Sequence, residues 1–268
     1  MIHATAMTSQ SLMVTIPHSG EKVPEQTPWL KVLPETILMQ DVDRYVDVLY
    51  EPALKKLNIP FVKTQWHRYA GDLNRFDTDV DASTVLNHKT PKGPHVRGFH
   101  WMMTTKEEIL MPEPMTQETH DQLVQLIYKP FHEKIHELKN SLKKPCYHLD
   151  LHSMPSVGTA QHKDPGEQRA DIVISDQLGK SASTGFRDLV ITSFVTAGFK
   201  VGYNWPYVGG RVTETYGQPQ AGHHTLQVEL NRSLYMNETT KKLNPDIAKI
   251  QSQLESALSG IVKKILQL

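Results

Sequence analysis

The chain has 268 residues, of which 38% are hydrophobic and 22% charged, and its 29 basic side chains balance its 29 acidic ones. This composition is typical of a globular protein, and the formal net charge of zero gives no electrostatic footprint for nucleic acid. No basic and apolar leader opens the sequence, and no apolar run is long enough to span a bilayer. We therefore expect a cytoplasmic protein with no nucleic-acid or membrane partner. No Gly/Ser-rich linker divides the chain, so we expect a single domain over residues 1–268.

Apolar runs of strand length alternate with segments of helical spacing, which predicts an α/β fold with a mixed, mostly parallel sheet flanked by helices. The expected strands are 12–16, 60–64, 146–151, 171–175, 200–203 and 225–230. The expected helices are 36–57 with a kink at Pro52, 117–142, 184–197, and a last one with Asn244 as its cap and Pro245 in its first turn. Two segments, 76–116 and 204–222, fit no regular pattern, and long irregular segments usually cover a site.

The residues that could bind a metal or take part in catalysis lie at the carboxyl ends of the expected strands, because open parallel sheets bind ligands beyond those ends. His18 follows the first strand and His152 follows a middle strand. Two histidines and a nearby carboxylate form the ligand set of zinc peptidases. Glu229 lies inside an apolar strand, where a glutamate is costly to bury unless it is paired or used. The alternative is an edge strand on which Glu229 faces solvent.

These residues lie in a series of segments along the chain: 16–20, 41–47, 68–75, 150–154, 209–213, 216–217, 227–229 and 234–236. Together and in this order, the segments resemble the N-formylglutamate amidohydrolase family. That family is in turn distantly similar to the zinc carboxypeptidases. The resemblance implies a carboxypeptidase-like α/β fold and one Zn²⁺ per chain. It also implies hydrolysis of the formyl amide of N-formyl-L-glutamate to formate and L-glutamate.

The resemblance places His18 and His152 on the metal and leaves two candidates for the third ligand. The carboxypeptidase pattern, with a ligand three residues after the first histidine, indicates Glu21. The amidohydrolase pattern indicates Asp43, which we rank first. The other carboxylate would then accept a hydrogen bond from a ligating histidine, a common arrangement. We expect Asp150, two residues before His152, to orient it.

In the implied reaction, Glu229 accepts a proton from the attacking water and later protonates the departing amine, while Arg68 stabilises the oxyanion. The substrate carries two carboxylates, for which guanidinium groups are well suited. Arg75 and Arg211 are the candidate cations, and Asn74 and Tyr216 are further candidate substrate contacts.

Two alternative functions remain open at this stage. One is a related zinc hydrolase that acts on another N-acyl amino acid or on a peptide with a free carboxylate. The other is a binding protein for an acidic metabolite on the same fold, against which Glu229 argues, because binding alone needs no general base. The sequence leaves the oligomeric state open.

Overall fold

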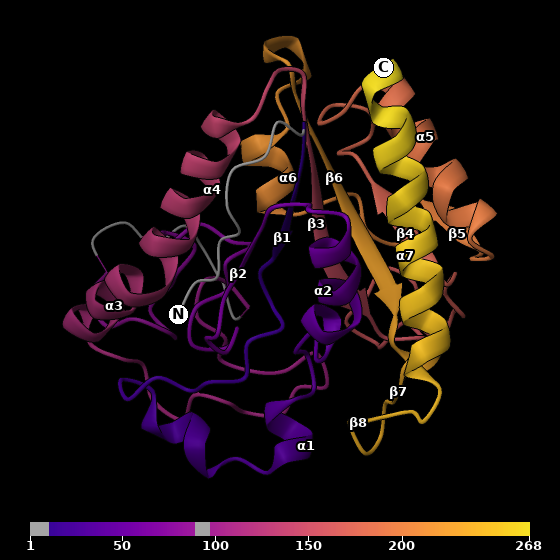
Figure 1. Cartoon of the computed structure of the whole chain (residues 1–268). Helices are drawn as coiled ribbons and strands as arrows, with labels where there is room; N and C mark the ends of the chain where they lie inside the picture. The colour runs from indigo at the N-terminus through magenta and orange to yellow at the C-terminus, as the bar shows by residue number, and fades with distance from the viewer. Residues whose placement is uncertain (1–10, 89–96) are drawn as a thin grey trace.

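The structure, a computed structural model, describes residues 11–88 and 97–268. Within these residues, six strands form one sheet in the order β2-β1-β3-β6-β4-β5 (Figure 1). The strands are β1 Leu12–Ile16, β2 Phe61–Lys63, β3 Cys146–Met154, β4 Ile172–Ser175, β5 Val201–Tyr203 and β6 His223–Asn231. Neighbouring strands are parallel except for β4 and β6, which are antiparallel. The predicted mixed, mostly parallel sheet is therefore confirmed.

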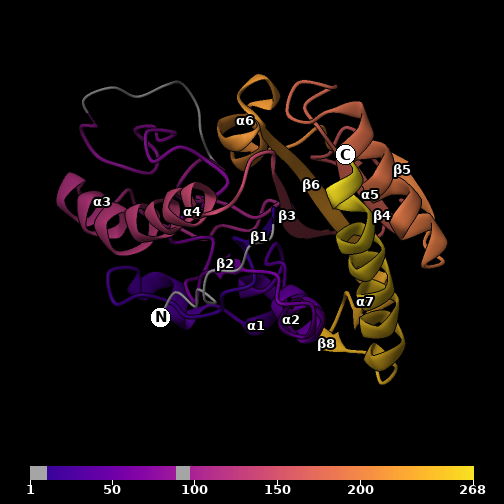
Figure 2. The same cartoon turned by 45° about the horizontal axis from the view of Figure 1, so that its top comes forward.

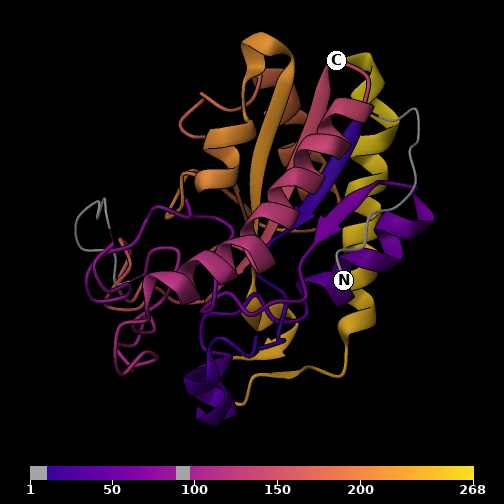
Figure 3. The ribbon, with the colours of Figure 1, turned by 90° about the vertical axis from the view of Figure 1, so that its left-hand side faces the viewer.

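Helices cover both faces of the sheet, as Figures 2 and 3 show for α4 on one side and for α2 and α7 on the other. The helices are α1 Glu35–Leu38, α2 Val46–Lys56, α3 Gln117–Leu123, α4 Lys129–Ser141, α5 Thr184–Thr196, α6 Arg211–Tyr216 and α7 Ile247–Lys264. A π-helical turn, Val124–Tyr128, joins α3 to α4, and a short hairpin pairs β7 Met236–Asn237 with β8 Lys242–Leu243. No helix within residues 11–88 and 97–268 is long and apolar enough to cross a membrane.

The two faces of the sheet differ in chemistry, because successive side chains of a strand point to opposite sides. On one face, side chains such as Leu149 and Val228 pack with α2, α5 and α7. On the other face, Met13 and Cys146 pack with α4. Buried polar residues of the three central strands share this second face: Thr15 of β1, then His148, Asp150 and His152 of β3, then Thr225, Gln227 and Glu229 of β6. The polar side chains on this face extend to the carboxyl ends of these strands.

The expected helix 36–57 is wrong as a continuous element. It is divided into α1 and α2, and Tyr45, just before α2, has a left-handed backbone with φ 69°. Contacts with distant segments hold the interruption: the Asp41 carboxylate accepts a hydrogen bond from the hydroxyl of Tyr69, and the backbone N–H of Asp43 donates to the carbonyl of His18. Tertiary contacts thus override the helical spacing here.

Other expected boundaries also change. The last helix begins at Ile247 after Asp246, and the Asn244 side chain donates to the carbonyl of Ser233, so Asn244 is not the cap. β3 continues to Met154, which places His152 inside the strand. The segment 204–222, expected to be irregular, contains α6.

Strand β6 lies between β3 and β4, in the interior of the sheet. The solvent-facing edge position considered for Glu229 is therefore excluded, and its side chain is buried.

Candidate metal centre

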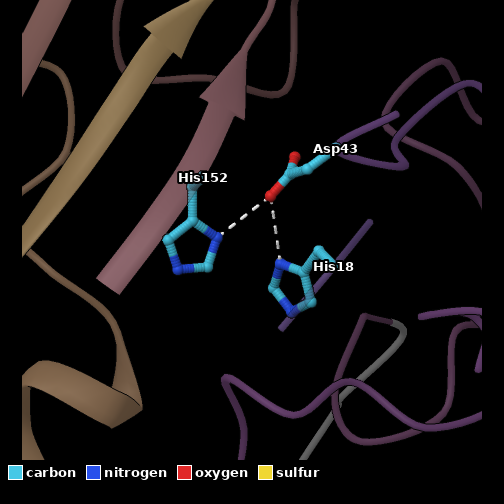
Figure 4. A group of neighbouring side chains, drawn as sticks. All are labelled: His18, Asp43 and His152. Carbon is cyan, nitrogen blue, oxygen red and sulfur yellow. Dashed lines mark hydrogen bonds and ion pairs between the residues drawn. The ribbon is translucent and has the colours of Figure 1, made fainter. Parts of the chain in front are cut away.

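His18, Asp43 and His152 bring their side chains together at the carboxyl end of the sheet (Figure 4). One oxygen of Asp43, Oδ2, lies 3.4 Å from His18 Nδ1 and 3.0 Å from His152 Nδ1. All three side chains are buried. His18 follows β1, Asp43 precedes α2, and His152 comes from β3, so three separate segments build the group.

The donor set and its spacing fit a metal ion. With metal–ligand distances of about 2.0–2.1 Å, the atoms of a tetrahedral site lie roughly 3.3 Å apart, close to the distances that Asp43 makes with both rings. Moreover, His18 Nδ1 is buried and has no hydrogen-bond partner among the described residues. A buried nitrogen without a partner is costly, and a cation would satisfy it.

A carboxylate holds the outer nitrogen of each histidine. His18 Nε2 lies 2.7 Å from Asp72 Oδ1, and His152 Nε2 lies 2.8 Å from Asp150 Oδ2. When a cation is bound, such contacts keep the proton on Nε2 and leave the lone pair of Nδ1 for the cation at the centre of the group. The arrangement agrees with the expectation that Asp150 orients His152.

Glu21 lies outside this group. Its carboxylate forms an ion pair with Arg44, with Oε1 at 2.8 Å from Nε, and 38% of its side chain is exposed. Of the two candidates for the third ligand, the structure therefore places Asp43 with the histidines.

Asp43 is a strong anion in this setting. In the metal-free protein, burial opposes its ionisation, but the neighbouring His152 and His18 side chains outweigh burial and hold the pKa of Asp43 well below its usual range. Arg232 adds to this effect with NH2 at 3.1 Å from Asp43 Oδ1, and its Nε donates to the hydroxyl of Ser153. Arg232 was not among the residues selected from the sequence. It directly follows β6, so its place at a strand end is a signal by which it could have been selected.

Glu229 stands beside the group, because the register of β3 and β6 pairs it with His152. Burial raises the pKa of Glu229, and the charge of His152 opposes that rise. Gln227 donates a hydrogen bond to Glu229 Oε1 at 2.8 Å. A carboxyl group with a raised pKa that is held by a neighbour suits general acid–base work near neutral pH.

These residues open onto a cavity of about 360 Å³. Its lining includes His18, Asp43, His152, Glu229, Arg68, Asn74 and Arg75, so the cavity brings together most of the residues selected from the sequence. Three further cations also line it: Arg97, Lys163 and Arg232. Arg97 and Lys163 lie in segments between helices and strands, where no periodicity marks them.

The cations of the cavity fall into two groups. Arg68 is paired with Asp72 at 2.8 Å, and Arg232 with Asp43. By contrast, Arg75, Arg97 and Lys163 have no carboxylate within ion-pair distance among residues 11–88 and 97–268. Within the part of the chain that the structure describes, Arg75 and Arg97 bond only to neutral acceptors: Arg75 to the carbonyls of Arg97 and Asn74, Arg97 to the carbonyl of Thr104 and the amide of Gln161. These three cations remain available for an anionic ligand.

Comparison with known proteins agrees with this geometry. A model of the family described as N-formylglutamate amidohydrolase matches residues 10–236, well over half of the chain. The chain belongs to this family.

Relatives in the N-formylglutamate amidohydrolase family cover nearly the whole chain. The N-formylglutamate deformylases of Pseudomonas aeruginosa and Pseudomonas putida are 25% identical over 235 and 234 residues, which is 85% of this chain and 82% of each relative. The crystal structure of N-formylglutamate amidohydrolase from Ralstonia eutropha JMP134 has a TM-score of 0.88 at 26% identity and covers 100% of this chain and 98% of that one. The chain is therefore a member of a family of amide-hydrolysing enzymes.

Two residues expected at the site of this amidohydrolase do not line the cavity. Arg211 pairs with Glu214 at 2.7 Å, and its guanidinium lies over the ring of Phe76. Tyr216 is buried with its hydroxyl hydrogen-bonded to His132 Nδ1 at 2.8 Å. The matching sequence blocks gave no information on which way these side chains point.

Proposed function

We propose that this amidohydrolase is a zinc-dependent enzyme that cleaves the formyl amide of N-formyl-L-glutamate to formate and L-glutamate. The main observation behind the proposal is the buried group of His18, Asp43 and His152 beside Glu229. The same cavity also holds cations for which the described residues offer no carboxylate partner. The names of the Pseudomonas relatives support the choice of substrate.

His18, Asp43 and His152 would hold the zinc ion. Zn²⁺ supplies a Lewis acid that polarises a carbonyl oxygen and activates a water for attack. Glu229, fixed by Gln227, accepts the proton of the attacking water and later delivers it to the departing nitrogen. Its raised pKa assists both transfers, because a carboxyl group that holds a proton more tightly is a better base and remains a usable acid.

Arg68 contributes a fixed positive charge to the same end of the cavity. Its guanidinium donates to Asp72 and to the carbonyl of Asp41, and it lies over the ring of Trp101 at 4.6 Å. A cation held in place before the reaction stabilises a developing oxyanion without reorganising. We therefore keep Arg68 in the catalytic role implied by the resemblance.

Recognition of two substrate carboxylates falls to the cations that lack carboxylate partners. Arg75 keeps its proposed role, and Arg97 takes the second position that Arg211 was expected to fill, with Lys163 as a further cation. Asn74 supports this part of the cavity through its side-chain oxygen, which accepts from the backbone N–H of Val212 at 2.8 Å. Charge-assisted hydrogen bonds to carboxylates are roughly twice as strong as neutral ones, so these groups dominate binding.

The test combines metal analysis with a comparison of substrates. Purified protein should contain one zinc ion per chain and release formate from N-formyl-L-glutamate much faster than from N-formyl-L-glutamine. Equal turnover of the two would replace this proposal with a broader N-acyl amino acid hydrolase. Tight binding of N-formylglutamate by zinc-loaded protein without any turnover would instead support the metabolite-binding protein.

A further inference from the structure

A line of buried polar side chains continues from His152 away from the cavity. Asp150 accepts from His152 through Oδ2 and from the hydroxyl of Thr15 through Oδ1, at 2.6 Å from Thr15 Oγ1. Thr15 Oγ1 in turn lies 2.7 Å from His148 Nε2. All four residues have at most 3% exposure, so water does not compete for these bonds.

The direction of each hydrogen bond follows from the number of protons available. The Asp150 carboxylate can only accept, so the single hydroxyl proton of Thr15 is donated to it. Thr15 Oγ1 must then accept from His148, which requires a proton on His148 Nε2. Burial lowers the pKa of His148 to about 4, so at neutral pH its ring carries one proton only. His148 Nδ1 is left as an acceptor, 3.5 Å from the hydroxyl of Thr225.

The sheet itself fixes these positions. His148, Asp150 and His152 alternate along β3 and therefore share one face, and the register of β1 and β3 pairs Thr15 with Asp150. Because both oxygens of Asp150 are occupied, the carboxylate cannot rotate without breaking a buried hydrogen bond. Its Oδ2 stays on His152 Nε2, which keeps Nδ1 turned toward Asp43.

The two histidines of the metal centre are supported differently. Asp72, the partner of His18, is held by Arg68, by the indole of Trp101 and by the backbone N–H of Asn74. Among the described residues, Asp150 is held instead by one neutral hydroxyl besides His152, that of Thr15, which can be removed without changing the charge of the site. This difference makes the role of Thr15 accessible to mutation.

We propose that Thr15, held by His148, is a positioning residue for the metal ligand His152, which it orients through Asp150. This inference rests on the proposed metal site but not on the proposed substrate. His148 donates a hydrogen bond to Thr15 Oγ1 and accepts none from it, so the hydroxyl proton of Thr15 is donated to Asp150.

Replacement of the hydroxyl by a methyl group tests the proposal. Thr15→Val should weaken zinc binding about 10- to 100-fold, the usual effect of losing a partner behind a ligating histidine, as measured by competition with a chromophoric chelator. Thr15→Ser keeps the hydroxyl and should restore most of the affinity. Thr27→Val is the matched control, because Thr27 is equally buried and its hydroxyl donates to the carbonyl of Pro24, a backbone group that makes no hydrogen bond to the metal centre.

Zinc affinity in Thr15→Val equal to that of the wild type would overturn the proposal. An equal loss in Thr15→Val and Thr27→Val would do the same, since it would reflect general destabilisation. Wild-type protein that binds no zinc would contradict the proposed metal site, which is a separate failure.

A second measurement tests the hydrogen-bond chain in the wild-type protein without metal. Nitrogen-15 NMR of the metal-free wild-type protein should show His148 with its proton on Nε2. A proton on Nδ1 of His148 would reverse the bond to Thr15 and contradict the chain. Assignment of the His148 resonance comes from its loss in His148→Gln, and zinc affinity and turnover play no part in this readout.

Discussion

Glu229 combines burial, a neighbouring histidine and a fixed amide partner, which is the environment expected of a general base. Glu229→Gln removes the base but keeps the shape of the side chain. We expect the variant to fold and retain zinc while turnover falls on the order of 10² to 10⁴. Measuring zinc content and kcat on the same preparation checks this. Near-normal turnover by zinc-loaded Glu229→Gln would assign the base to another residue.

Asp43 and Glu21 are the two candidates for the third metal ligand, and their alanine variants distinguish between them. Asp43→Ala should abolish zinc retention, because it removes the atom that faces both histidines. Glu21→Ala removes only a part-exposed ion pair with Arg44 and should change stability by about 0–1 kcal/mol with zinc retained. Elemental analysis of the two proteins decides the matter, and zinc loss confined to Glu21→Ala would reverse the assignment.

Arg75 and Arg97 differ from Arg211 in having no carboxylate partner among residues 11–88 and 97–268. Arg75→Gln and Arg97→Gln should each raise KM for N-formylglutamate on the order of tenfold to a hundredfold, since hydrogen bonds to charged groups are worth roughly 1.5–3 kcal/mol. Arg211→Gln serves as the control and should leave KM nearly unchanged, because its charge is already paired with Glu214. Steady-state kinetics test all three, and a large KM effect in Arg211→Gln alone would restore the original assignment.

At the scale of elements, the segment after β1 is shaped by its contact with residues 65–67. Backbone hydrogen bonds join Lys22 to Gln65 and His67, and a Cβ on Gly20 would lie 2.5 Å from the carbonyl carbon of Gln65. Backbone atoms cannot yield as a flexible side chain can. The chain from β1 to His18 is therefore positioned by a close approach that only glycine allows.

Gly20→Ala should consequently weaken zinc binding and lower the midpoint of thermal unfolding, because the segment that carries His18 must shift. The control is Gly185→Ala in α5, where the added Cβ meets only the end of the Leu268 side chain at 3.3 Å. Alanine also favours a helix by about 1 kcal/mol over glycine, so this variant should be no less stable. Unchanged zinc affinity in Gly20→Ala would show that the segment adapts.

Across the whole molecule, several histidines that are buried fully or in part predict acid lability. Burial lowers the pKa of His67 and His100 to about 3 and that of His132 and His148 to about 4. In the unfolded chain these groups have the ordinary histidine pKa of about 6.5. As pH falls below that value, the unfolded state takes up protons that the folded state refuses. The contribution of these neutral histidines to the free energy of unfolding is therefore fully present above pH 6.5 and is lost as pH falls toward 4.

We expect the free energy of unfolding of the metal-free protein to fall between pH 6.5 and pH 4, by up to about 1.4 kcal/mol per pH unit for each such histidine. Urea unfolding at a series of pH values measures it, and His132→Asn should reduce the slope by one histidine's share. Asp150 raises the pKa of His152 against the effect of burial. The contribution of His152 to stability is fully present below pH 6.5, so it does not change the slope of stability against pH between 6.5 and 4. A flat profile in this window would contradict the prediction.

The class of fold and the candidate residues of the site can be predicted from the sequence. Alternating apolar runs are enough to predict strands and helices, and the strand-end rule selected His18, His152 and Glu229, because parallel strands deliver their carboxyl ends to one edge of a sheet. The period-2 pattern from His148 to His152 also lies in the sequence, although only the pairing with Thr15 shows what it does.

The tertiary structure decided what depends on contacts between distant segments. Helical spacing across residues 36–57 could not reveal that Asp41 and Asp43 are drawn out of a helix by Tyr69 and His18. The choice of Asp43 over Glu21 and the pairing of Arg211 with Glu214 were equally hidden. Local propensity is set by neighbours along the chain, whereas ion pairs and metal sites are set by distances that exist only once the chain is folded.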